Sequence, residues 1–143
     1  MQFYVNGFAF SKDYKKVILM KKEKPEWQKG FLNGIGGKVE KSDSSFKNAM
    51  AREFKEETGV YTLPDSWNLF CSIRGKDFYL EFFSSQLSDK NFELAKTIEL
   101  EIIKKIPIKE VFTYPTVNNL SWLIPLALNI EADKSETIVV YST

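Results

Sequence analysis

The sequence contains no histidine and a single cysteine, Cys71. A lone cysteine excludes a disulfide within the chain and a cysteine-based zinc site, and the missing histidines exclude histidine-ligated metal. Serine–histidine chemistry is excluded as well, and Cys71 has no histidine to activate it as a nucleophile. We expect Cys71 to be a small buried hydrophobic residue. Acid–base chemistry must then come from Asp, Glu, Lys, Tyr or metal-bound water.

The chain also lacks an excess of either charge and lacks long apolar runs. Lys and Arg number 20 and Asp and Glu number 19, so the net charge is +1 and does not favour duplex nucleic acid or a membrane surface. No apolar stretch approaches the roughly 18 residues of a membrane span, and the first residues do not resemble a secretion signal. We expect a cytoplasmic protein without a duplex or membrane partner. A small phosphorylated ligand that brings its own metal agrees better with this charge balance than a nucleic-acid duplex does.

The composition that remains is typical of a globular protein. Hydrophobic residues make up 43% and charged residues 27% of the 143 residues, and 12 of the residues are phenylalanine. This length predicts one domain over residues 1–143, large enough to bury a core without disulfides. Apolar periodicity and turn residues predict strands over residues 3–10, 17–21, 30–39, 67–73, 78–84, 98–106 and 137–141, one helical turn over 107–112 and a helix over 117–130. Residues 21–29 and 85–96 are expected to be polar loops.

A further predicted helix carries the most concentrated group of charged residues. Asp43, Ser44 and Ser45 are suitable N-cap residues, and Gly59 is suited to end the helix. At helical spacing Phe46, Ala49, Met50 and Phe54 form one apolar stripe. The preceding segment contains Gly34, Gly36 and Gly37, where the backbone turns or approaches another group closely.

Three glutamates of this helix, Glu53, Glu56 and Glu57, are neighbours on one face, and Glu53 and Glu57 fall inside the apolar stripe. We expect the three carboxylates to be aimed inward, which is costly unless a cation compensates their charge. Oxygen ligands suit Mg²⁺ or Mn²⁺. The alternative is an ordinary solvated acidic face. Arg52 precedes Glu56 by four residues and is expected to hold that carboxylate in place.

The stretch over residues 36–60, GGKVEKSDSSFKNAMAREFKEETGV, resembles the Nudix box. That pattern is Gly, five residues, Glu, seven residues, Arg-Glu, an apolar residue, any residue, Glu-Glu, any residue, Gly and an aliphatic residue. Gly37 matches the first position, and residues 52–60 match the second half without a gap. The departure lies between them, because Asp43 stands at the position of the first Glu and one extra residue separates it from Arg52.

The resemblance implies an α/β (α+β) fold, an α/β/α sandwich around a central mixed β-sheet, and hydrolysis of a nucleoside diphosphate linked to another group. It implies that Glu53, Glu56 and Glu57, together with Gly37, form a Mg²⁺ site, with Mn²⁺ possible. Arg52 belongs to the same catalytic group. One of these glutamates, or a Glu from a later loop, would deprotonate the attacking water. For the later residue we favour Glu99, at the start of a predicted strand, over Glu93 and Glu101.

The resemblance extends to the MutT-type branch, which cleaves oxidised purine nucleoside triphosphates, through residues 31–40 (FLNGIGGKVE) and 105–128 (KIPIKEVFTYPTVNNLSWLIPLAL). Together with the box this covers well over half of the chain. In that branch an Asn before the glycines and two acidic residues before the last helix read the base; Asn33 matches the first, and Asn118 and Asn119 replace the acids. Helix capping is the alternative role for Asn118 and Asn119. Residues expected at the substrate are Asn33, Lys38, Asn118 and Asn119, with Trp27, Phe78, Tyr114 and Trp122 as stacking surfaces.

Three functions are consistent with these residues. The first is Mg²⁺-dependent hydrolysis of a nucleoside triphosphate, with an oxidised or modified purine as one option, to a nucleoside monophosphate and pyrophosphate. The second is cleavage of ADP-ribose, a dinucleotide or a capped RNA end at the same site; relatives that cleave ADP-ribose carry a proline in the region that Arg74 to Lys76 occupy here. The third is a non-catalytic nucleotide sensor. The chain is expected to be a monomer or a homodimer.

Overall fold

The computed structural model describes residues 1–129 and 138–141. Its strands are β1 (Gln2–Phe10), β2 (Lys16–Lys21), β3 (Leu32–Asn33), β4 (Ile35–Lys38), β5 (Asn68–Arg74), β6 (Phe78–Gln86), β7 (Ile102–Pro107) and β8 (Ile138–Tyr141). Its α-helices are α1 (Phe46–Thr58), α2 (Asp89–Leu94) and α3 (Leu120–Leu128). Three short 3-10 helices complete the described part: η1 (Glu26–Gln28), η2 (Pro64–Ser66) and η3 (Ile108–Thr113).

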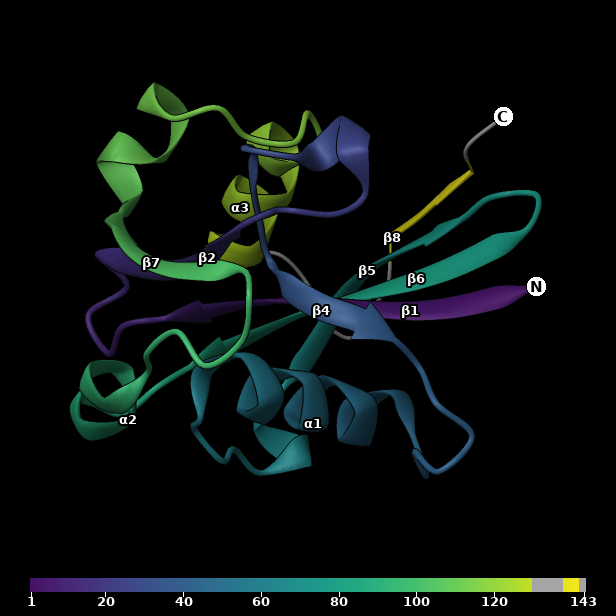
Figure 1. Ribbon diagram of the computed structural model, residues 1–143, viewed down its shortest axis with the longest axis horizontal. Coiled ribbons are helices and arrows are strands. Elements are labelled where there is room, and N and C mark those ends of the chain that lie inside the picture. Colours follow the sequence, from purple (N-terminus) through teal and green to yellow (C-terminus); the bar gives the residue numbers. More distant parts are fainter. Residues whose placement is uncertain (130–137, 142–143) are drawn as a thin grey trace.

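The strands form one mixed sheet around β1, which lies between β6 on one side and both β2 and β4 on the other (Figure 1). The main strand order is β3-β2-β1-β6-β5-β8, with β7 paired to β2 and β4 paired to β1. The β1–β6 and β5–β8 pairs are parallel, and the other pairs are antiparallel. Because β4 extends the sheet beside the first half of β1, the glycine-rich segment runs directly over α1.

Each face of the sheet has its own hydrophobic core, since successive side chains of a strand point to opposite faces. From β1, Val5 and Ala9 join the core under α1, whereas Phe8 and Phe10 join the core under α3. Cys71 is fully buried in the second core, as the sequence predicted. In Figure 1 α1 and α2 lie on one side of the sheet and α3 on the other. The predicted α/β sandwich with a mixed sheet is therefore confirmed.

Both ends of α1 are fixed by the residues that the sequence indicated. The Ser45 hydroxyl oxygen accepts a hydrogen bond from the backbone N–H of Asn48 at 3.0 Å, which is an N-cap bond. Gly59 ends the helix with φ 78°, in the left-handed region that glycine adopts without steric cost. Met50 and Phe54 are fully buried, and the Phe54 ring meets Trp67 edge-on with ring centroids 5.2 Å apart. The apolar stripe thus seats α1 on the sheet.

Most predicted elements are present, with shifted ends. Both predicted hairpins form, as β1–β2 and β5–β6, and the last predicted strand is β8. The helical turn before the last helix is η3, and the last helix is α3, which starts at Leu120 rather than at Val117. None of the described helices has both the length and the apolar character needed to cross a bilayer.

Two local predictions are wrong. Residues 85–96 are not a loop throughout, because β6 continues to Gln86 and α2 follows, capped by the Ser88 hydroxyl. The strand predicted over residues 98–106 begins only at Ile102. The residues before it bond to the end of α1 instead, since the N–H groups of Lys96 and Ile98 donate to the carbonyls of Thr58 and Glu57. Glu99 therefore lies in a connection and does not begin a strand.

The N-cap gives a stability prediction. Ser45→Ala removes the acceptor for the Asn48 N–H and is expected to lower the free energy of unfolding by about 1 kcal/mol. Urea denaturation measures the change. Ser44→Ala is the matched control, because the Ser44 hydroxyl contacts only the Asn48 side chain and not the helix backbone. Equal losses in the two variants would contradict a specific cap at Ser45.

Candidate active site

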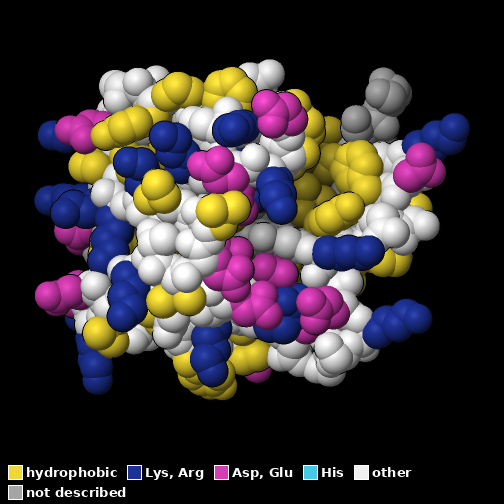
Figure 2. Space-filling view, in the orientation of Figure 1, with side chains coloured by type: hydrophobic (Ala, Val, Ile, Leu, Met, Phe, Trp, Pro, Cys, Tyr) yellow, Lys and Arg dark blue, Asp and Glu magenta, His cyan; other side chains and the backbone are white. Residues whose placement is uncertain are grey.

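The three glutamates of α1 lie at different depths. The Glu53 side chain is 11% exposed and Glu57 is half-buried, but the Glu56 side chain is 45% exposed. The prediction that all three face inward is therefore wrong for Glu56, which lies outside the apolar stripe and reaches solvent. Figure 2 shows acidic side chains gathered at the centre of the face that carries β4 and α1, with Lys and Arg side chains beside them.

Arg52 holds this acidic group together. Its Nε and Nη2 atoms donate to the two Asp43 oxygens at 2.9 Å each, and its Nη1 donates to Glu53 and Glu56 at 3.1 Å. Nη2 also donates to the backbone oxygen of Lys38. The expected Arg52–Glu56 pair is present, and it is one of several contacts that this guanidinium makes.

Asp43 has a structural place despite its shifted position in the sequence. Its carboxylate accepts two bonds from Arg52 and one from the Glu40 backbone N–H at 2.8 Å. The bonds from Arg52 hold the pKa of Asp43 below its usual value, and the Asp43 contact is the main cause that raises the pKa of the Arg52 guanidinium. The extra residue is accommodated in the loop before α1, so the carboxylate still reaches Arg52.

Glu53 lies against the backbone of β4 at Gly37. A Cβ atom added to Gly37 would come within 2.5 Å of Glu53 Oε1, so a larger residue at this position would displace the carboxylate. Burial raises the pKa of Glu53, and Arg52 opposes that shift. Gly37 therefore packs directly against Glu53, whereas its predicted part in a metal site stays a prediction.

Glu57 forms no salt bridge among the described residues, although the positive charge of Lys22 acts to lower its pKa. Its Oε2 atom is buried and makes no hydrogen bond. Burial raises the pKa of Glu57 to about 7, with further contributions from the negative charges of Glu99, Glu101 and Glu53, in that order. An ionised carboxylate is therefore costly at this position unless a cation approaches it.

The connection before β7 brings a second set of acids to Glu57. A cavity of about 150 Å³ is lined by Glu23, Lys24, Glu57, Glu99, Leu100 and Glu101. Glu101 is already engaged, because it accepts from Lys22 Nζ at 3.1 Å and from the Glu23 N–H at 2.7 Å. Glu99 is exposed, and Glu93 lies on α2 and does not line this cavity. Of the three later acids that the sequence offered, Glu99 and Glu101 approach the helix.

The donor set fits a hard divalent cation. The carboxylates of α1 supply only oxygen ligands, and Glu57 Oε2 makes no hydrogen bond among the described residues. Glu53 and Glu57, with Glu56 beside them, are the residues that could hold the ion. Within residues 1–129 and 138–141 no three acidic, histidine or cysteine side chains are already gathered around a common point. Binding would therefore require the glutamate side chains to turn toward one another.

A separate pocket of about 470 Å³ collects four of the predicted substrate residues, Trp27, Asn33, Phe78 and Asn119. In the view of Figure 2 a hollow lined by hydrophobic side chains opens beside the acidic group. Two further polar lining residues, Asn6 and Gln28, were not predicted. The signal that could have found Asn6 is its place in β1, because this polar residue lies on the same face of the strand as Phe8 and Phe10, which belong to the core under α3.

Four other predicted substrate residues do not line this pocket. Tyr114 and Trp122 are exposed at 41% and 38%, and Lys38 is exposed at the end of β4. Asn118 is exposed and uses its backbone oxygen to accept from Ser121. Asn119 occupies the position before α3, but its side chain makes no capping bond. The capping alternative is therefore wrong for the Asn119 side chain.

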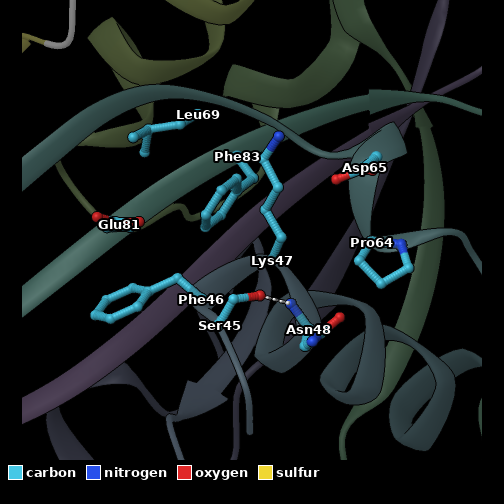
Figure 3. A pocket seen from close by; sticks show the side chains of 9 residues that line it. All are labelled: Ser45, Phe46, Lys47, Asn48, Pro64, Asp65, Leu69, Glu81 and Phe83. Carbon is cyan, nitrogen blue, oxygen red and sulfur yellow. Dashed lines mark hydrogen bonds between the residues drawn. The ribbon is translucent and has the colours of Figure 1, made fainter.

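A shallower pocket of about 690 Å³ lies over the start of α1, away from the glutamates (Figure 3). Ser45, Phe46, Lys47 and Asn48 form one wall, and Leu69, Glu81 and Phe83 from the sheet form its floor. None of the residues predicted for the metal or the substrate lines it. This pocket therefore does not coincide with the glutamates that the sequence predicts as the active site.

A family model described as NUDIX domain matches residues 3–119, which include the glycine-rich segment, α1 and the connection before β7. No curated protein matches significantly. A MutT structure from work on Aliivibrio salmonicida and Vibrio cholerae is 21% identical, with 88% of this chain and 96% of that chain covered and a TM-score of 0.73.

Two other solved structures share the fold. The NUDIX domain of Shewanella oneidensis NrtR, complexed with ADP ribose, is 18% identical, with coverage of 87% of this chain and 84% of that chain and a TM-score of 0.73. A MutT protein from Bacillus halodurans is 17% identical, with coverage of 99% and 87% and a TM-score of 0.68. At these identities the similarity shows the fold alone.

The environment of Glu57 gives a pH prediction for the protein in EDTA. The folded-state pKa of about 7 lies above the ordinary value of 4.5, so the folded state binds this proton more tightly than the unfolded chain does. The corresponding stability is present at low pH and is lost as the pH rises from about 4.5 through about 7. Glu57→Gln removes this loss, so its melting temperature should exceed that of the wild type more at pH 8 than at pH 5.

Thermal unfolding at both pH values measures the difference. Glu93→Gln, on the exposed surface of α2, is the control and should give the same small difference at both. A Glu57→Gln effect that is equal at pH 5 and pH 8 would contradict a raised pKa at Glu57.

Proposed function

This chain belongs to the NUDIX domain family, and on that premise we propose that it is a Mg²⁺-dependent hydrolase that converts a nucleoside triphosphate to a nucleoside monophosphate and pyrophosphate. The observation that carries the proposal is the place of Glu57, a half-buried carboxylate whose Oε2 makes no hydrogen bond among the described residues and whose pKa is raised more by burial and by Glu99, Glu101 and Glu53 than Lys22 lowers it. A cation and a phosphate chain are the ligands that such a group accommodates.

The path from the amide-lined pocket to the glutamates supports a nucleotide as substrate. Asn33 lines the pocket, and Gly37, four residues later, touches Glu53. Four residues of extended chain span at most about 14 Å. One nucleotide can therefore place its base between Trp27 and Phe78 and its phosphates at α1.

The roles of the chain's own residues follow from their contacts. Glu53, Glu56 and Glu57 would hold the Mg²⁺, and Arg52 keeps Glu53 and Glu56 in position. When bound, the ion neutralises charge on the phosphate oxygens and makes water a stronger acid. Glu99, which is exposed beside Glu57, takes a proton from the attacking water. The oxygen of that water bonds to phosphorus while the phosphoanhydride P–O bond breaks and pyrophosphate leaves. Glu101 is less suited to this role because Lys22 already engages it.

ADP-ribose is the second candidate substrate, because the NrtR domain that shares this fold was solved with ADP ribose. The products distinguish the two activities: a triphosphate gives a monophosphate and pyrophosphate, whereas ADP-ribose gives AMP and ribose phosphate. A protein that binds nucleotides with Mg²⁺ but turns none of them over would instead be a sensor.

The test is a panel of nucleoside triphosphates, oxidised purine triphosphates, ADP-ribose, dinucleotides and capped RNA, assayed with Mg²⁺ or Mn²⁺ by product chromatography. We expect pyrophosphate release that EDTA abolishes. Glu57→Gln should lower kcat by about 100-fold or more, since it removes a negative oxygen ligand, and Glu99→Gln should cause a loss of about 10²–10⁴-fold if it removes the general base. Glu93→Gln is the control and should retain the wild-type rate. Absence of metal-dependent hydrolysis across the whole panel would overturn the proposal.

A further inference from the structure

Glu81 is a half-buried carboxylate that the proposed reaction does not use. It lies on β6 and contributes to the floor of the pocket of about 690 Å³ over the start of α1 (Figure 3). Its Oε2 atom accepts a hydrogen bond from the Tyr79 hydroxyl at 2.8 Å. Its Oε1 atom makes no hydrogen bond among the described residues and is not buried. One oxygen of this carboxylate is therefore available to a ligand in the pocket.

No cation among the described residues compensates the charge of Glu81. This carboxylate forms no salt bridge there, and burial raises its pKa, opposed by the Tyr79 hydrogen bond and by no lysine or arginine. Lys47 lines the same pocket, but in the view of Figure 3 the Phe83 ring lies between its side chain and Glu81. The Arg74 guanidinium lies over the Tyr79 ring, with Cζ 5.0 Å from the ring centroid. A carboxylate withdrawn from water without a counter-charge favours the approach of a cation.

Apolar side chains form much of the surface around this carboxylate. Phe46, Pro64, Leu69 and Phe83 line the pocket with it. The Phe46 ring meets Tyr79 edge-on, with ring centroids 5.8 Å apart, and Phe83 is buried in the core under α1. The face of an aromatic ring attracts a cation, and apolar surface accommodates a hydrocarbon chain. A ligand that satisfies both features carries a positive charge on an apolar body.

The wall formed by α1 has two features that favour an anion instead. One is Lys47, and the other is the start of the helix, where backbone N–H groups carry partial positive charge. One of those N–H groups, that of Asn48, is already bonded to the Ser45 hydroxyl. An anion in the pocket would also face two carboxylates, those of Asp65 and Glu81, whereas a cation would face one lysine. The charges of the lining residues therefore favour a cation.

We propose that this pocket binds an alkylammonium group, with the ammonium on Glu81 and the hydrocarbon chain against Leu69 and Phe83. An ammonium group has three N–H donors, one of which can bond to Glu81 Oε1. The site is separate from the glutamates of α1, and the inference does not depend on the proposed hydrolysis. A free amine and the lysine side chain of another protein share this chemistry.

The experiment titrates the ¹⁵N-labelled full chain with butylammonium chloride and follows the backbone amide signals by NMR. Butyrate and 1-butanol carry a similar hydrocarbon chain with a negative charge or none. We expect saturable shifts at the residues that line the pocket, and an affinity for butylammonium at least about tenfold higher than for the other two, because a hydrogen bond to a charged group is the stronger kind. Shifts confined to other regions, equal affinities or tighter binding of butyrate would overturn the inference.

Two variants test the part of Glu81. Glu81→Gln keeps an oxygen that can accept from the Tyr79 hydroxyl but removes the charge, so the affinity for butylammonium should fall about tenfold or more. Asp65→Asn is the matched control, because Asp65 lines the same pocket but is exposed, and its affinity should stay within about twofold of the wild type. Equal losses in the two variants would indicate attraction by overall negative charge and would overturn the inference.

A lysine derivative distinguishes the two sources of the ammonium group. Tighter binding of Nα-acetyl-lysine methylamide than of butylammonium would assign the site to a lysine of a protein partner, and weaker binding would assign it to a free amine. Both outcomes support the inference when the binding is lost in Glu81→Gln. If that variant does not fold, the comparison of butylammonium with butyrate and 1-butanol on the wild type decides the point.

Discussion

The contacts of one guanidinium, that of Arg52, hold the acidic end of this molecule together. It bonds to Asp43 with two nitrogens, reaches Glu53 and Glu56 with a third, and also binds the Lys38 backbone oxygen. These contacts join the end of β4, the loop before α1 and the helix itself. Without this charge the carboxylates would repel one another, and the ordering of the loop would cost entropy without compensation. Because arginine stays protonated at any relevant pH, the arrangement does not depend on titration.

The hydrogen bonding of the last carbonyls of α1 is a second constraint on the structure. The last carbonyls of a helix need donors, and here the backbone of the connection before β7 supplies two of them, at Glu57 and Thr58. Gly59 reverses the chain, and the donors, Lys96 and Ile98, come from about forty positions later in the sequence. This bonding carries Glu99 and Glu101 to Glu57. The same connection that supplies hydrogen bonds to the end of α1 thus also brings negative charges close to Glu57. These charges, together with burial, raise the pKa of Glu57.

Much of this could be predicted from the sequence, because it depends on local rules. The two hairpins follow from alternating apolar residues and turns, and α1 follows from its cap at Ser45, its stop at Gly59 and its apolar stripe. The inward position of Glu53 follows from helical periodicity. Glu56 was predicted wrongly, because it lies outside the apolar stripe and its side chain is 45% exposed where it pairs with Arg52. The short helix α2 was missed because six mainly polar residues carry no periodic pattern.

The hydrogen-bonded chain of side-chain amides that runs from Asn6 through Asn33 to Gln28 could not be predicted from the sequence. Asn6 and Asn33 are 27 positions apart and meet only because β1 and β3 both pair with β2 in the sheet. The sequence by itself determined the family pattern, the caps of α1 and the oxygen-only character of the possible metal ligands. Tertiary structure alone decided which later acids reach Glu57, how Asp43 meets Arg52 and which amides meet at the pocket. The physical reason is that periodicity and capping act within a few residues, whereas electrostatic pairing and hydrogen-bond direction depend on groups that only the folded sheet brings together.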